Sequence, residues 1–173
     1  MNRRRFLFIA AAAAFSGTAQ AQTTTWQADM LGGTVRVDLR GPRGLCEDTA
    51  RRIGATIAEV EAAASLFKAD SALCRLNSAS YLDNPPPALL ALLHLSDHLH
   101  KATGGLFDPT VQPLWRALAE GRSPAEGRIA IGWERVSIGP AIRLAEGQAL
   151  TFNGIAQGYA ADRVRDGVAA NLA

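Results

Sequence analysis

One segment of the chain combines the residue types of a rigid binding loop. Residues 104–115 read Gly-Gly-Leu-Phe-Asp-Pro-Thr-Val-Gln-Pro-Leu-Trp. The glycines free the backbone, whereas the prolines fix it locally and remove two backbone donors. A single carboxylate, Asp108, stands near the aromatic Phe107 and Trp115, which suits one polar contact to a ligand between apolar walls. The same composition also suits a helix C-cap at Gly104, followed by a tight loop whose aromatic side chains fill the core.

A second candidate lies at residues 153–158, Asn-Gly-Ile-Ala-Gln-Gly, just before an expected helix. Gly154 would let the backbone approach a ligand closely, and the helix would point its N-terminal N–H groups and dipole at that ligand. The pyrophosphate of a dinucleotide fits such a position, but an ordinary Asn-Gly turn has the same sequence. The pattern is neither a P-loop nor the dinucleotide fingerprint, so both interpretations stay open.

The histidines and cysteines form no recognisable metal motif. His94 and His98 have the i, i+4 spacing that can chelate a metal, but no Glu stands in the motif position and no third ligand is evident. We interpret them, with His100, as partly exposed helix residues. The spacing of Cys46 and Cys74 matches no metal site and favours free, buried thiols, although an oxidising compartment would permit a disulfide between them.

The elements that must position these residues are a mixture of helices and strands. Hydrophobic periodicity and turn residues predict a strand at 34–39, helices at 45–64 and 88–102, short strands at 136–138, 141–144 and 149–152, and a helix at 155–170. Strands and helices do not alternate regularly, so the fold class is α+β rather than a doubly wound sheet.

The N-terminus predicts export. Three arginines precede an apolar run over residues 8–15 and an Ala-Gln-Ala ending at residue 21, which is typical of a signal peptide over 1–21. The Arg-Arg-x-Phe-Leu pattern resembles a twin-arginine signal, so we expect a periplasmic protein consisting of residues 22–173. Of the 18 basic residues, three leave with the signal, and 15 then face 16 acidic ones. This near-neutral balance does not predict nucleic-acid binding.

Three segments, in order, resemble the ApbE family of FAD:protein FMN transferases. Residues 65–77, Ser-Leu-Phe-Lys-Ala-Asp-Ser-Ala-Leu-Cys-Arg-Leu-Asn, are similar to its Ser-x-Tyr-x-x-x-Ser-x-(Leu/Ile)-x-Arg-(Leu/Phe)-Asn stretch. Residues 105–111 resemble its Gly-x-Phe-Asp-Pro-Thr-Val signature. Residues 153–162 are similar to its Gly-Gly-Ile-Ala-Lys-Gly-Tyr-Ala-x-Asp stretch. The third segment resembles the NosX-type branch, which is tied to maturation of nitrous oxide reduction. The matches cover about the first half of the family's length, which implies a truncated ApbE-like (T-fold-like) domain.

The resemblance implies a flavin site. It assigns contacts with FAD to Phe67, Leu106, Phe107, Asp108 and Thr151. It also assigns the main-chain carbonyl of Gly154 to a Mg²⁺ site. Three positions of the chain differ from the family. Phe67 occupies the position of a Tyr and Gln157 that of a Lys. Thr151 occupies the position of an Asp, whose negative charge a Thr cannot supply. The family's side-chain metal ligands and its His belong to the other half, so no catalytic residue is assigned.

The implied reaction is the Mg²⁺-dependent transfer of FMN from FAD to a Thr or Ser hydroxyl, with release of AMP. The target would be a flavoprotein subunit of a membrane or periplasmic redox complex. Such chemistry depends mainly on positioning and on charge stabilisation. Two alternatives stay open: a periplasmic protein that binds flavin without catalysis, and a partner in a maturation complex that makes no contact with flavin.

Overall fold

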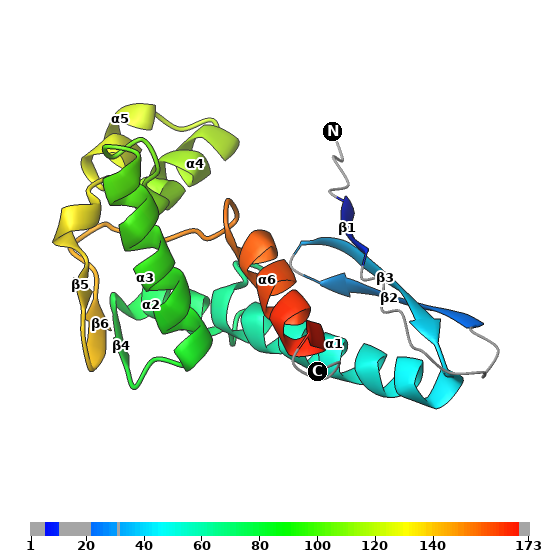
Figure 1. Ribbon diagram of the computed structural model, residues 1–173. Helices are drawn as coiled ribbons and strands as arrows, with labels where there is room; N and C mark the ends of the chain where they lie inside the picture. Colours follow the sequence, from blue (N-terminus) through cyan, green and yellow to red (C-terminus); the bar gives the residue numbers. More distant parts are fainter. Residues whose placement is uncertain (1–5, 11–21, 31, 170–173) are drawn as a thin grey trace. The chain divides into compact units, whose positions relative to one another are not determined.

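The computed structural model describes residues 6–10, 22–30 and 32–169 (Figure 1). The expected signal-peptide cleavage site at residues 19–21 lies outside the described residues. The chain divides into two compact units. We call residues 1–61 and 157–173 the terminal unit, and residues 62–156 the central unit.

The terminal unit is built around a three-stranded sheet. Its strands are β1 (Phe6–Ala10), β2 (Gln22–Met30) and β3 (Gly33–Gly41). β3 lies in the middle, parallel to β1 and antiparallel to β2. The strand expected at 34–39 is therefore confirmed, whereas the sequence analysis missed β2. The alternation of β3 buries one face of the strand, as period-two patterning predicts.

Two helices complete the core of the terminal unit. They are α1 (Arg43–Ala64) and α6 (Ala156–Ala169), close to the bounds expected from the sequence. The buried core consists of Val35, Val37, Leu39, Cys46, Ala50, Ile53, Ile57 and Val164. Gly54 has a packing role here, since a methyl group on it would lie 3.2 Å from Cζ2 of Trp26. The indole of Trp26, on β2, thus lies against α1 at Gly54, where no side chain stands in its way.

The central unit combines short helices with a small antiparallel sheet in the order β4-β6-β5 (Figure 1). Its main elements are α2 (Ala72–Ala79), β4 (Tyr81–Asp83), α3 (Pro87–Ala102), η1 (Pro109–Val111), α4 (Gln112–Ala119), α5 (Pro124–Ile129), η2 (Trp133–Arg135), β5 (Ser137–Ile138) and β6 (Ala141–Arg143). Its largest fully buried side chains are Leu73, Leu76, Leu89, Leu92, Leu93, Ile142, Leu150 and Phe152. Each such side chain contributes about 1.5–3 kcal/mol to the free energy of unfolding.

The expected strand at 149–152 is wrong. These residues form no strand in the structure, because the backbone of Leu150 bonds to a side chain and that of Thr151 to a loop carbonyl. The helices at 112–119 and 124–129 were not predicted, and Pro113 and Pro124 stand near their starts. In the structure those prolines occupy the first turns of both helices, where a missing N–H costs nothing.

Both cysteines are free thiols. Cys46 is buried in the core of the terminal unit. Cys74 is half-buried in the central unit, and its Sγ donates to the carbonyl of Ser65 at 3.4 Å. A search of the described residues for a helix long and apolar enough to cross a membrane finds none.

Candidate functional site

The loop that carries Asp108 begins at the C-terminus of α3. The N–H of Gly105 donates to the carbonyl of His100 at 2.8 Å, and that of Gly104 donates to the carbonyl of Lys101 at 3.2 Å. This pair of bonds closes a helix at a left-handed residue. Backbone φ is +61° at Gly104 and +87° at Gly105, a region that favours glycine. The helix end expected at Gly104 is therefore confirmed, although the C-cap residue itself is Thr103. The two glycines direct the chain out of the helix into the loop.

The carboxylate of Asp108 is held by three donors. One oxygen accepts from the backbone N–H and the hydroxyl of Thr110, at 2.8 and 2.6 Å. The other accepts from the backbone N–H of Trp133 at 3.2 Å. These bonds fix the direction of the carboxylate before any ligand binds. Trp115, expected as an apolar wall of this loop, lies on α4 and is 66% exposed, and the tryptophan that contacts Asp108 is Trp133.

The structure brings the second and third family-like segments together. The N–H of Thr151 donates to the carbonyl of Pro109 at 2.9 Å. A methyl group on Gly154 would lie 3.6 Å from Cε2 of Phe107, an ordinary contact distance. The ring of Phe107 therefore packs against the backbone at Gly154. An aromatic ring, a fixed carboxylate and an exposed Gly154 thus belong to one contiguous surface.

One side chain joins the first family-like segment to Leu150, three residues before the third segment begins. The amide nitrogen of Asn77, on α2, donates to the carbonyl of Leu150 at 2.9 Å. Its amide oxygen accepts from the N–H of the same residue at 2.7 Å. The first and second family-like segments are therefore each bonded to residues 150–151, which directly precede the third segment. The sequence analysis quoted Asn77 as part of a motif but gave it no role.

Two other expected FAD contacts are strongly exposed. Leu106 is 92% exposed and Phe67 is 77% exposed. The turn that carries Phe67 is fixed by Ser65, whose hydroxyl accepts from the N–H groups of Phe67 and Lys68 at 3.1 and 3.2 Å. Large apolar side chains on rigid turns are available to an aromatic ligand without first leaving a core.

Thr151 shapes the turn before α6. Its hydroxyl accepts from the N–H of Asn153 at 3.3 Å, a local turn typical of Ser and Thr. The N–H groups of Ile155 and Ala156 both donate to the carbonyl of Phe152, at 2.9 and 2.8 Å. The half-buried Thr151 and the exposed Asn153 therefore lie in a tight, hydrogen-bonded turn that leads into α6.

A complete metal site is not formed by the described residues. No three His, Cys, Asp or Glu side chains of residues 6–10, 22–30 and 32–169 are grouped so that they could hold a metal ion. Magnesium prefers six oxygen ligands, usually with one or two carboxylates. The carbonyl of Gly154, which the resemblance assigns to a Mg²⁺ site, is a single oxygen. His94 and His98 are exposed on α3.

A further set of buried polar groups links the Asp108 loop to Gly132 by hydrogen bonds. The hydroxyl of Thr110 accepts from the N–H of Gly132 at 2.9 Å. The carbonyl of Gly132 accepts from the buried Gln148 side chain at 2.6 Å. Sequence reasoning missed these residues, because a Gly-Trp pair and a lone Gln carry no recognisable signal. Their bonds hold Trp133 where its N–H reaches Asp108.

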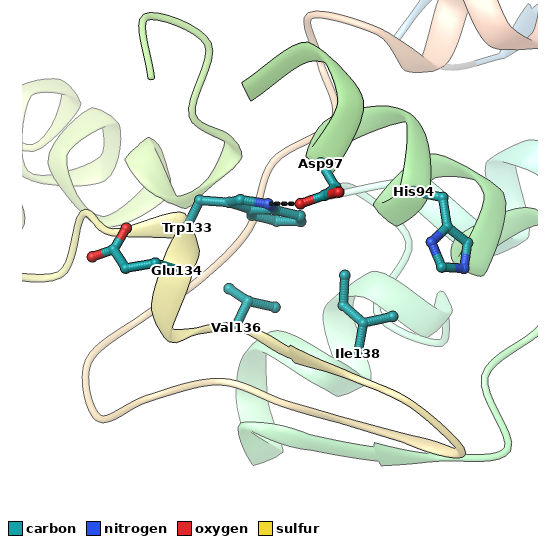
Figure 2. Close-up of a pocket in the computed structure, with 6 residues that line it drawn as sticks. All are labelled: His94, Asp97, Trp133, Glu134, Val136 and Ile138. Carbon is teal, nitrogen blue, oxygen red and sulfur yellow. Dashed lines mark hydrogen bonds between the residues drawn. The ribbon is translucent and has the colours of Figure 1, made fainter. Parts of the chain in front are cut away.

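A surface cavity of about 330 Å³ lies beside Trp133 and is lined by His94, Asp97, Trp133, Glu134, Val136 and Ile138 (Figure 2). Figure 2 shows the indole Nε1–H of Trp133 bonded to Asp97, at 3.2 Å, while Val136 and Ile138 point toward α3. The Lys101 ammonium, followed by the Trp133 indole, lowers the pKa of Asp97 below its usual value. None of the FAD contacts expected from the sequence lines this cavity.

Comparison with known proteins gives a consistent result. The model of the ApbE family matches residues 23–172. No curated protein matches the chain. Among solved structures, the chain is similar to the apo form of the flavinyl transferase ApbE of Pseudomonas stutzeri, with 24% identity and a TM-score of 0.71. It is also similar to the flavin transferase ApbE of Vibrio cholerae, with 21% identity and a TM-score of 0.74.

The extent of these matches is uneven. The match to the Pseudomonas stutzeri structure includes 89% of this chain, and the match to the Vibrio cholerae structure includes 87%. Each match includes only 54% of the solved structure's own chain. The ApbE protein of Thermotoga maritima gives similar values, with 21% identity, a TM-score of 0.72, and coverage of 84% and 52%. The chain therefore spans about half the length of these structures and shares the fold of that half.

Proposed function

Because the chain belongs to the ApbE family, we propose that it takes part in the transfer of FMN from FAD to a Thr or Ser hydroxyl of a target flavoprotein. The observation that carries this proposal is the meeting of the Phe107–Asp108 loop with the turn at Thr151 and Gly154. In the reaction, the target's oxygen bonds to the phosphorus of the FMN moiety, the bond from that phosphorus to AMP breaks, and the hydroxyl proton is released.

The residues of this chain would bind and orient FAD. Phe107 offers a ring fixed against Gly154, and the exposed Leu106 and Phe67 add apolar surface. Asp108 offers a carboxylate whose direction is fixed by three donors. Positioning of this kind accelerates phosphoryl transfer, because a fixed geometry lowers the entropic part of the activation barrier.

The turn before α6 would face the phosphates of FAD. The helix begins at Ala156, two residues after the exposed Gly154. The dipole of this helix favours an anion near its N-terminus. Thr151 lacks the charge of the family's Asp and would contact FAD through its hydroxyl. Bound Mg²⁺ would supply charge neutralisation, with the Gly154 carbonyl as one ligand, but the described residues do not complete that site. No step is therefore assigned to the metal.

The cellular setting is part of the proposal. We expect cleavage after residue 21, twin-arginine export and a periplasmic location. The target would then be a flavoprotein subunit of a membrane or periplasmic redox complex, and the NosX-like third segment would place the chain in that branch of the family.

A second candidate is a flavin-binding or maturation protein without catalysis. Thr151 and Gln157 favour it, since they remove one negative and one positive charge found at these positions in the family. As a flavin-binding protein it would share the FAD site with the first candidate but show no turnover, and as a maturation partner it would make no contact with flavin.

One experiment separates the two candidates. The chain is mixed with FAD, Mg²⁺ and a target flavoprotein, and AMP release is followed together with the mass of the target. Transfer predicts AMP and a target heavier by one FMN. Binding alone predicts FAD affinity without AMP. Absence of both overturns the proposed function.

A further inference from the structure

His100 contacts the loop that carries the proposed flavin residues. It is half-buried in the last turn of α3, and its Nδ1 lies 2.9 Å from the carbonyl oxygen of Phe107. A carbonyl oxygen can only accept a hydrogen bond. Nδ1 must therefore carry a proton and donate it to Phe107.

This bond completes the restraint of the Phe107 backbone. The N–H of Phe107 donates to the hydroxyl of Thr103 at 3.0 Å, and His100 holds its carbonyl. The next residue, Asp108, is held through its side chain by Thr110 and Trp133. The peptide between Phe107 and Asp108 is thus fixed at both ends, and so are the directions of the ring and the carboxylate.

The imidazole itself is fixed by packing. Its ring centroid lies 6.5 Å from that of Trp133, with the two planes tilted by 39°. On another side, a methyl group placed on Gly105 would lie 3.6 Å from Cε1 and 3.8 Å from Nε2 of His100. The proximity of Trp133 and of the backbone at Gly105 restricts the ring, while Nδ1 lies at hydrogen-bond distance from the carbonyl of Phe107.

We infer that His100 is a positioning residue for FAD: it orients the Phe107–Asp108 peptide so that the aromatic ring and the carboxylate meet the flavin together. The inference rests on the proposed function, because it requires that FAD binds at this loop. His100 acts through the loop and needs no contact with FAD. The neighbouring His98, exposed on the same helix, has no such role and provides the matched control.

The first test measures the tautomer of His100 in the wild-type chain by long-range ¹⁵N–¹H correlation NMR. We expect Nδ1 of His100 to carry a proton, as its contact with the carbonyl oxygen of Phe107 requires. Protonation at Nε2 alone would overturn the inference, since Nδ1 could then not donate to Phe107. This measurement needs no substitution and does not depend on the proposed function.

The second test measures FAD affinity in four chains: wild type, His100→Leu, His100→Asn and His98→Leu. Loss of one hydrogen bond that leaves a carbonyl unpaired should weaken binding about tenfold in His100→Leu. Asn places an amide N–H near the position of Nδ1, so His100→Asn should restore affinity to within about twofold, as His98→Leu should retain it.

The outcomes separate the two claims. If the wild type binds FAD and His100→Leu binds it equally well with an unchanged unfolding midpoint, the positioning role is wrong. Equal losses in His100→Asn and His100→Leu also overturn it, because a donor at that position would then have no effect. If the wild type shows no FAD affinity while His100 has the Nδ1–H tautomer, the proposed function fails and the loop restraint stands.

Discussion

The side chain of Asn77 bonds to both backbone groups of Leu150, which is 73 residues away in the sequence. The amide mimics the edge of a neighbouring strand, with one donor and one acceptor at 2.9 and 2.7 Å. Leu150 is fully buried, so water cannot replace these bonds. This one residue therefore holds α2 to the segment that continues into Thr151 and Gly154.

Asn77→Ala should destabilise the chain strongly. It leaves a buried N–H and a buried carbonyl of Leu150 without partners, and each unsatisfied group costs about 1–3 kcal/mol. We expect the free energy of unfolding to fall by about 2–4 kcal/mol in urea titrations. The control is Ser78→Ala on the exposed side of the same helix, which should change it by less than about 0.5 kcal/mol. Equal losses in the two variants would contradict the assigned role of Asn77.

The same pair shows where sequence reasoning stops. The apolar run at 149–152 predicted a strand, and its residues are indeed buried, apart from the half-buried Thr151. The partners of its backbone, however, are the Asn77 side chain and the Pro109 carbonyl. Periodicity reports burial and cannot reveal what bonds to a backbone. Helices with long periodic faces, such as those at 43–64 and 87–102, were predictable. The helices at 112–119 and 124–129 are too short to show a period.

Gly127→Ala should disrupt the contact between α4 and α5. A methyl group on Gly127 would lie 2.4 Å from the Cα of Leu114, and backbone cannot move aside as a flexible side chain can. We expect a loss of about 3 kcal/mol or more in the free energy of unfolding, beyond the usual cost of overpacking.

The matched control for this substitution is Gly139→Ala in the same unit. A methyl group there would meet only the carbonyl oxygen of Ala141, at 3.8 Å. Its effect should stay within about 0.5 kcal/mol. A stable Gly127→Ala chain with an unchanged urea midpoint would show that the two helices are not in the described contact.

Acidification should remove the contribution that the Asp97 carboxylate makes to the free energy of unfolding. The Lys101 ammonium and the Trp133 indole lower the pKa of Asp97 from its usual 3.8. Because its pKa is lower in the folded than in the unfolded chain, its contribution to stability is complete above 3.8 and is lost as the pH falls through the lowered value. Wild type should therefore be more stable than Asp97→Asn at neutral pH, and urea titrations should show that advantage shrinking in this acidic window. A difference between the two chains that does not change with pH would contradict the pKa shift.

The candidate site was only partly visible in the sequence. The resemblance identified Phe107, Asp108, Thr151 and Gly154, and the structure brings their two segments together. The resemblance could not show that the backbone N–H of Trp133 donates to the Asp108 carboxylate, because that contact joins residues 25 positions apart. Trp115 seemed the obvious aromatic neighbour in sequence, but the turn into α4 leaves it exposed.

Phe107→Ala should weaken FAD binding while Trp115→Ala should not. Both residues are aromatic and belong to the same sequence segment, but only Phe107 packs against Gly154. Loss of one aromatic contact should raise the Kd for FAD about tenfold, as measured by quenching of flavin fluorescence. Equal effects of the two substitutions would show that the described contact between Phe107 and Gly154 is irrelevant to binding.

The most direct test of the central claim is hydrogen exchange of the wild-type chain with and without saturating FAD, read by mass spectrometry of its peptides. The account predicts slower exchange in two segments, residues 104–110 and 150–156, and unchanged exchange in peptides from α4 and α5. Protection confined to the cavity lined by Trp133, Val136 and Ile138, or no protection at saturating FAD, would contradict the assignment of the flavin site to the meeting of the Phe107 loop and the Gly154 turn.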